Sequence, residues 1–144
     1  MNKFLRFISL AKAVVIMISL LLLISCSDKE DPIGKWDDII KLSTKDVDFT
    51  AAADSISITT EGDWWWIDRI IFEDSTYNYY QREDIDLEAE SYSLKENSFL
   101  VEKRDNQTLF VKINRNTTGE ERFMVITLEA GNYFDYVHIQ QAAD

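Results

Sequence analysis

The sequence predicts an all-β fold, a small antiparallel β-sandwich, in residues 43–144. Apolar and polar residues alternate with a period of two through most of this region, as they do in strands with one buried face. Turn-forming pairs such as Gly131-Asn132 separate the alternating segments, and no segment shows the sustained spacing of a long helix. Together these observations indicate about seven strands in two packed sheets.

Two short strands open the region. Val47 and Phe49 alternate with acidic residues, and Ile56 and Ile58 alternate with serine and threonine. Each segment therefore presents one apolar face to a core and one polar face to solvent. The turn Glu61-Gly62-Asp63 ends this part of the chain.

A long strand of aromatic and β-branched residues is expected from Trp64 to Phe72. Neighbouring side chains in a strand point to opposite faces of the sheet. One face should hold Trp65, Ile67 and Ile71, and the other Trp64, Trp66, Asp68 and Ile70. The three adjacent tryptophans therefore cannot all enter one core.

Residues 73–90 are rich in tyrosine and acid. Residues 73–80 place three tyrosines among polar residues, which indicates a long loop. From Asp84 to Glu90 acidic residues alternate strictly with apolar ones, which predicts a strand with one acidic face. Carboxylates are the ligands that calcium prefers, but a straight strand splays them apart. We therefore interpret this face as a solvated or charged sheet edge and expect no metal site.

The last third of the chain is expected to contain four strands, at residues 99–103, 108–113, 123–128 and 133–141. A turn joins the first two, and a loop over residues 114–121 leads to the third. The last strand should point Val137 and Ile139 inward.

The chain begins with a segment typical of export. Basic residues precede a run that is uncharged over the 15 residues from Ala13 to Ser27, which is shorter than the roughly 18 to 20 residues that a helix needs to cross a bilayer. The run ends in Leu23-Ile24-Ser25-Cys26, which resembles the lipobox of bacterial lipoproteins. This resemblance implies that residues 1–25 are a signal peptide and that Cys26, the only cysteine, carries a lipid anchor.

The charge of the remaining chain limits its partners. Residues 1–25 hold three of the 15 basic residues and none of the 26 acidic ones, so the other 119 residues carry a net charge of −14. Such a charge argues against nucleic acid or an anionic membrane surface as a partner, since both require basic patches. The length suits one domain, which a hydrophobic core must hold together without a disulfide.

A polar segment joins the anchor to the sandwich. Cys26-Ser27 followed by clustered acids resembles the surface-export signal of Bacteroidetes lipoproteins, which implies the outer face of the outer membrane. Residues 34–42 then place apolar side chains at roughly helical spacing, either as a short helical turn or as an arm packed on the domain. The expected organisation is a signal peptide over residues 1–25, a tether and arm over 26–42, and a sandwich over 43–144.

A family resemblance covers roughly Ser43 to Asp144. It is carried by the tryptophans at 64–66 and by four later motifs, Thr108-Leu109-Phe110-Val111-Lys112-Ile113, Asn116-Thr117-Thr118-Gly119 with Arg122, Ala130-Gly131-Asn132, and Val137-His138-Ile139-Gln140-Gln141. In this order they resemble the BACON domain, the Bacteroidetes-associated carbohydrate-binding, often N-terminal domain. The resemblance implies an immunoglobulin-like sandwich that binds carbohydrate or mucin, and it does not imply catalysis.

We expect binding rather than enzymatic activity. The only histidine, His138, is out of phase with the inward residues of its strand and has no companion that would suggest a catalytic or zinc site. Sugar rings stack on flat aromatic surfaces, so the candidate ligand-binding residues are Trp64, Trp66, Tyr77, Tyr79 and Tyr80. The expected function is a surface-displayed outer-membrane lipoprotein that binds glycans or mucin-like glycoproteins without a cofactor. The alternative is a non-catalytic protein-interaction or spacer module of a cell-surface assembly.

Overall fold

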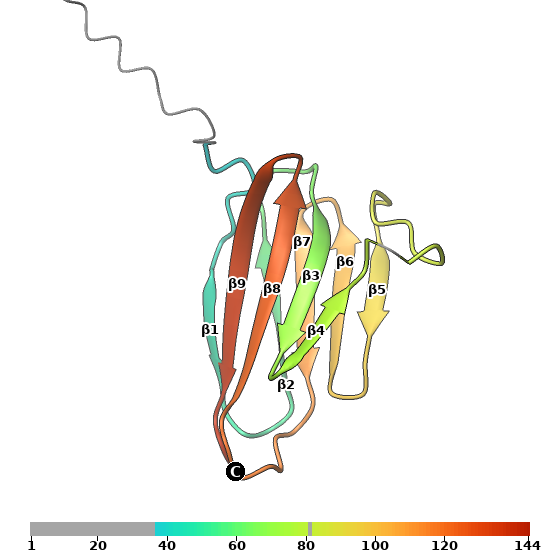
Figure 1. Ribbon diagram of the computed structural model, residues 1–144. Helices are drawn as coiled ribbons and strands as arrows, with labels where there is room; N and C mark the ends of the chain where they lie inside the picture. Colours follow the sequence, from blue (N-terminus) through green and yellow to red (C-terminus); the bar gives the residue numbers. More distant parts are fainter. Residues whose placement is uncertain (1–36, 81) are drawn as a thin grey trace, which may run out of the picture. The chain divides into compact units, whose positions relative to one another are not determined.

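A computed structural model describes residues 37–80 and 82–144, which form nine strands in two sheets (Figure 1). The first sheet, in the order β1-β9-β8-β3-β4, contains β1 (Asp46–Phe49), β3 (Trp66–Phe72), β4 (Ser75–Asn78), β8 (Arg122–Ala130) and β9 (Tyr133–Gln141). The second sheet, in the order β2-β7-β6-β5, contains β2 (Asp54–Thr59), β5 (Tyr92–Lys95), β6 (Phe99–Asp105) and β7 (Thr108–Ile113). The predicted signal peptide, Cys26 and the tether lie outside the described residues.

The two sheets confirm the predicted all-β sandwich and have an immunoglobulin-like arrangement. As in that fold, β3, β8 and β9 share one sheet while β2, β6 and β7 share the other. The prediction of purely antiparallel pairing is wrong at one place, because β1 runs parallel to β9 from Asp46 opposite His138 to Phe49 opposite Gln141. The chain changes sheets between β1 and β2, so β1 lies beside the last strand instead of pairing with its neighbour in sequence.

The core fills the space between the inner faces of the sheets. The first sheet and the residue before β3 contribute Ile67, Ile126 and Trp65, and the second sheet contributes Leu109 and Val111. Each of these side chains is at most 1% exposed. Among the described residues, the buried apolar cluster begins at Ile40 and ends at Ile139. A chain that starts at Ser27 therefore retains all of this core.

The segment before β1 packs on the sandwich as an arm, which was one of its two predicted forms. Ile40 is 1% exposed and belongs to the core, and Leu42 forms an antiparallel bridge with Thr60. A Cβ atom on Gly62 would lie 2.2 Å from the backbone oxygen of Ile39. Glycine at position 62 is therefore what lets the arm lie against the β2–β3 connection.

The region between β3 and β6 differs from its prediction. Residues 75–78, expected in a loop, form β4 in a hairpin with β3, and residues 92–95 form β5. The acidic segment from Asp84 to Glu90, expected as a strand, is irregular. Its acids are exposed while Ile85 and Leu87 pack against the core, so the alternation reflects a loop with one buried side.

A β-bulge at Asp68 changes which residues of β3 face the core. Ile67 pairs with Leu128, but the next pair is Arg69 with Thr127, so Asp68 has no opposite residue in β8. An extra residue reverses the alternation beyond it. Ile70 is consequently buried and Ile71 half-buried, the reverse of the predicted faces.

A buried polar network closes the end of the sandwich that carries loop 114–121. The Asn116 side chain is fully buried and donates to the backbone oxygens of Glu120 (2.7 Å) and Ala142 (2.9 Å). The Arg122 guanidinium donates to the Gln141 side-chain oxygen through Nε at 3.1 Å. These hydrogen bonds hold loop 114–121 and the end of β8 against the last residues of the chain, so Asn116, Arg122 and Gln141 have a structural role.

Candidate functional site

The candidate site lies where the β3–β4 pairing stops. β4 pairs with β3 only from Arg69 to Phe72, so the first residues of β3 extend beyond the end of their neighbour. The Tyr92 hydroxyl accepts the Ile67 N–H at 2.8 Å, which satisfies the backbone there without a strand. Residues 82–91 cross this region as a loop, and the space between loop and sheet remains open as a hollow.

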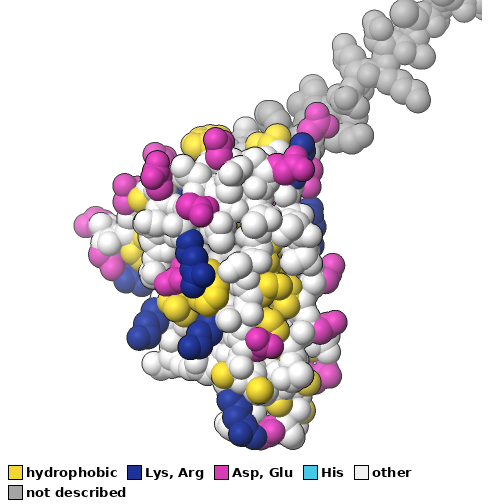
Figure 2. All heavy atoms as spheres, turned by 180° about the vertical axis from the view of Figure 1, so that it is seen from behind, with side chains coloured by type: hydrophobic (Ala, Val, Ile, Leu, Met, Phe, Trp, Pro, Cys, Tyr) yellow, Lys and Arg dark blue, Asp and Glu magenta, His cyan; other side chains and the backbone are white. Residues whose placement is uncertain are grey.

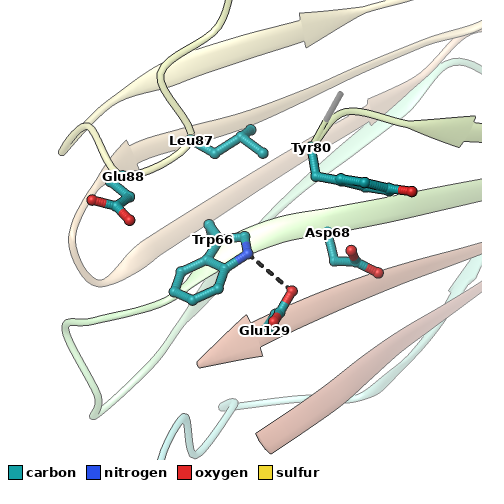
Figure 3. Close-up of a pocket in the computed structure, with 6 residues that line it drawn as sticks. All are labelled: Trp66, Asp68, Tyr80, Leu87, Glu88 and Glu129. Atoms are coloured by element: carbon teal, nitrogen blue, oxygen red, sulfur yellow. Dashed lines mark hydrogen bonds between the residues drawn. The ribbon is translucent and has the colours of Figure 1, made fainter. Parts of the chain in front are cut away.

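This hollow has a volume of about 430 Å³ and combines aromatic, apolar and acidic side chains. Its lining residues are Trp66, Asp68, Tyr80, Leu87, Glu88 and Glu129. Figure 3 shows Trp66 and Tyr80 on different sides of the hollow, Asp68 on β3, Glu129 on β8, and Leu87 and Glu88 on the loop. The volume lies within the range typical of small-ligand sites.

The tryptophan triplet divides as the sequence predicts. Trp65 is 1% exposed, and its indole N–H donates to the Thr60 hydroxyl at 3.1 Å. Trp64 is 62% exposed and meets the half-buried Trp66 edge to face, with ring centroids 5.4 Å apart. The Trp66 indole N–H donates to the Glu129 carboxylate at 3.1 Å, which fixes the ring at the edge of the hollow.

The three candidate tyrosines have different environments. Tyr80 is 61% exposed and lines the hollow. Tyr77 points inward and packs edge to face on Phe99 at 5.3 Å. Tyr79 is 2% exposed, and burial raises the pKa of its hydroxyl above the usual range. Tyr79 is therefore part of the core, and its prediction as an exposed ligand-binding residue is wrong because β4 gives the segment an inward face.

Sequence reasoning missed the acidic part of the site. Glu129 lies directly opposite Trp66 in the β3–β8 pairing, although 62 residues of chain separate them. Asp68 lies on the Trp66 side of the strand, where the alternation placed it, but nothing in the sequence marked it as a ligand-binding residue. The alternation at residues 84–90 was the one signal that pointed toward Leu87 and Glu88, and it predicted a strand.

A buried lysine supports the loop of residues 82–91, which forms one wall of the hollow. Lys103 on β6 is 3% exposed, and its ammonium donates to the Ala89 backbone oxygen at 3.0 Å and lies 5.3 Å from the Trp65 ring centroid. Burial lowers the pKa of Lys103, while Glu90 and Asp86 act in the opposite direction. This bond ties the loop to the core one residue after Glu88.

The chemistry of the hollow suits a neutral ligand rich in hydroxyl groups. Carboxylates accept hydrogen bonds from hydroxyls, whereas three of them together repel an anion. The exposed parts of Trp66 and Tyr80 offer flat apolar surface beside these acceptors. The site therefore combines stacking surface with acceptors, in a hollow open to solvent.

Other chemistries have less support from the described residues. His138 projects from the outer face of β9 and is exposed, with the Tyr136 ring 6.4 Å away. Within residues 37–80 and 82–144, no group of three or more His, Cys, Asp or Glu side chains is placed to hold a metal ion. That part of the chain also contains no helix long and apolar enough to span a bilayer.

Fold and site together define a two-sheet β-sandwich module with an open, aromatic and acidic hollow. No protein-family model matches the chain, and no curated protein matches its sequence. A protein from Bacteroides thetaiotaomicron, solved by NMR, has a similar structure with a TM-score of 0.60 and 24% identity, covering 79% of this chain and 94% of that one. That match supports the fold alone.

Two other solved structures are more distant. The Bacteroides ovatus GH5 xyloglucanase in complex with a XXXG heptasaccharide gives a TM-score of 0.46 and 16% identity, with 73% of this chain and 19% of the enzyme covered. WR4, a C. elegans MSP family member, gives 0.31 and 11%, with 75% and 100% covered. Neither carries an argument about this chain.

Proposed function

We propose that this chain is a non-catalytic, lipid-anchored module of the BACON type that binds neutral glycans at the cell surface. The observation that carries the proposal is the hollow, in which Trp66 and Tyr80 stand beside the carboxylates of Asp68, Glu88 and Glu129. Sugar C–H faces stack on the rings, and sugar hydroxyls donate to the carboxylates. Glycans bearing uronic acid or sulfate are excluded from this hollow because its three carboxylates repel them.

The binding test uses the chain from Ser27 onward with a panel of neutral polysaccharides and of mucins stripped of sialic acid and sulfate, and it measures tryptophan fluorescence and retention. At least one neutral glycan is expected to bind, and Trp66→Ala should weaken that binding by about tenfold or more, because the ring supplies the stacking surface. Phe123→Ala is the matched control, since Phe123 is an exposed aromatic on the same sheet but outside the hollow. Absence of binding across the panel, or equal losses in both variants, would contradict the proposal.

A protein-interaction module is the second candidate, and one observation favours it. The outer face of β8 and β9 exposes Phe123 (53%), Phe134 (42%) and Tyr136 (43%). Exposed aromatic residues on a flat sheet face are typical of protein interfaces. If Phe123→Ala abolishes capture of a surface partner while Trp66→Ala does not, the interaction module replaces the glycan module.

The anchor is proposed from the sequence, with Cys26 as the acylated residue. Two or more acyl chains hold a protein stably on a bilayer, since each buried methylene contributes roughly 0.8 kcal/mol. A Cys26→Ala variant should therefore leave the membrane fraction and lose its protease accessibility on intact cells. Continued membrane association of this variant would refute the anchor.

A further inference from the structure

The outer face of the second sheet carries a positive patch on a strongly acidic chain. It consists of Lys95 on β5, Lys112 on β7 and Arg104 on β6, around the apolar side chains of Leu100 and Phe110. Figure 2, which views the molecule from behind, shows Lys and Arg side chains gathered beside hydrophobic surface in the middle of this face. We refer to these five residues as the lysine face.

The two lysines of this face differ from the other bases of the described residues. Lys95 and Lys112 have no ion-pair or hydrogen-bond partner for their ammonium groups within residues 37–80 and 82–144. Every other Lys or Arg in those ranges has a carboxylate, carbonyl or side-chain amide acceptor. With acids in excess along the chain, two lysines on one sheet face that pair with none of them are available to an external anion.

The strand register sets the spacing of these charges. Lys95 lies opposite Leu100, and Leu100 lies opposite Lys112, so the three form one row across β5, β6 and β7. Strands in a sheet are separated by about 4.8 Å, which places the two lysine backbones about 10 Å apart. Two positive charges thus flank the apolar side chain of Leu100. Beside this row, the Arg104 guanidinium lies over the Phe110 ring, 3.5 Å from the ring centroid.

A shallow depression continues from this row and has a volume of about 420 Å³. Lys95, Lys112 and Leu100 line it together with the side chains of Asn97 and Asn114. Two carboxylates are close by: Glu96 lines the same depression, and Glu102 pairs with Arg104 at 3.1 Å. A densely charged polymer such as nucleic acid would meet these acids, whereas a polymer with widely spaced anionic groups can place them at the lysines alone.

We propose that the lysine face binds an acidic polysaccharide, a glycan with carboxylate or sulfate groups separated by uncharged sugar. The anionic groups pair with Lys95 and Lys112, and the intervening sugar lies on Leu100 and Phe110. This site is on the opposite sheet from the neutral-glycan hollow and does not depend on it. The module then holds two kinds of glycan on its two faces.

The experiment measures binding of the chain from Ser27 onward to immobilised hyaluronan and unsulfated chondroitin, whose carboxylates alternate with uncharged sugars, with dextran as the neutral reference. Binding to at least one of the two acidic polymers, decreasing as salt rises, is expected, since exposed ion pairs are screened. The double variant Lys95→Gln/Lys112→Gln should weaken it by about tenfold. The control variant Lys41→Gln/Arg115→Gln removes the same charge from exposed, already paired positions and should bind as the unmodified chain does.

Separate outcomes distinguish this proposal from the hollow. Trp66→Ala should leave binding of the acidic polymers unchanged, and a loss in that variant would overturn the assignment to the lysine face. Equal losses in the two double variants would show a general charge effect and overturn it as well. Competition by polyglutamate as effective as that by the polysaccharides would refute a glycan as the partner, as would failure of the unmodified chain to bind either acidic polymer.

Discussion

Lys103 provides a test of how the core and the binding loop are connected. Replacing it with methionine removes the bond to the Ala89 oxygen and the contact with the Trp65 ring, but keeps most of the apolar volume. An unmet backbone oxygen costs about 1–3 kcal/mol. Removing a buried charge offsets this, because hydrophobic replacements of buried ionic groups are often neutral or stabilising.

The net change at neutral pH is therefore expected to be small for methionine and large for alanine. Lys103→Met should alter the free energy of unfolding by no more than about 1 kcal/mol. Lys103→Ala also removes three methylenes, each contributing about 0.8 kcal/mol, and leaves a cavity, so it should lose about 2–4 kcal/mol. Urea unfolding followed by tryptophan fluorescence measures both changes.

The pH dependence gives this prediction a second test. Burial lowers the pKa of Lys103 in the folded state, while the unfolded lysine titrates near its ordinary value of about 10.4. Between these two pKa values the unfolded state binds more protons, so stability rises with pH. The unmodified protein should gain stability relative to Lys103→Met as pH approaches 10, by about 1.4 kcal/mol for each unit by which the pKa is lowered.

The comparison with Lys103→Met cancels the tyrosines whose pKa values burial raises, because both proteins contain them. If the two proteins show parallel stability curves between pH 7 and 10, the lysine is not desolvated and the reasoning fails. If Lys103→Met is as unstable as Lys103→Ala, the ammonium and not the apolar stem carries the stability. The first outcome would refute the desolvation of Lys103, and the second would refute the expectation that removing the buried charge offsets the loss of its bond to Ala89.

Further predictions concern two contacts that hold connecting segments against the sheets. Tyr92→Phe leaves the Ile67 N–H without its acceptor at 2.8 Å and should lower the free energy of unfolding in urea by about 1–3 kcal/mol. Tyr136→Phe, on the exposed outer face, should lower it by less than about 0.5 kcal/mol, and equal losses would contradict the role of the Tyr92 hydroxyl. Gly62→Ala places a Cβ atom 2.2 Å from the Ile39 oxygen, so it should destabilise the protein by about 1–3 kcal/mol and speed hydrogen exchange in residues 39–42. The control is Gly119→Ala, whose Cβ atom meets no atom within 4 Å, so that only the strain of its positive φ opposes the substitution. Unchanged exchange in Gly62→Ala would show that the arm does not depend on this contact.

The local alternation of residues determined much of the fold. It predicted a two-sheet all-β sandwich and put Trp65 on the opposite face of its strand from Trp64 and Trp66, because strand geometry links sequence parity to side-chain direction. It also predicted the Gly131-Asn132 hairpin, where Gly131 has a φ of 63°. Such features depend on residues close together in the chain, so the sequence is sufficient to predict them.

Tertiary structure decided which residues form the hollow. Parity does not predict the bulge at Asp68 that turns Ile70 into the core, because a bulge depends on how two distant strands pair. Glu129 reaches Trp66 only through the β3–β8 register, and the acidic segment faces the hollow only because β4 ends before it. The sequence alone therefore separated Trp65 from Trp64 and Trp66, whereas strand pairing turned Tyr77 and Tyr79 inward and placed Glu129 beside Trp66.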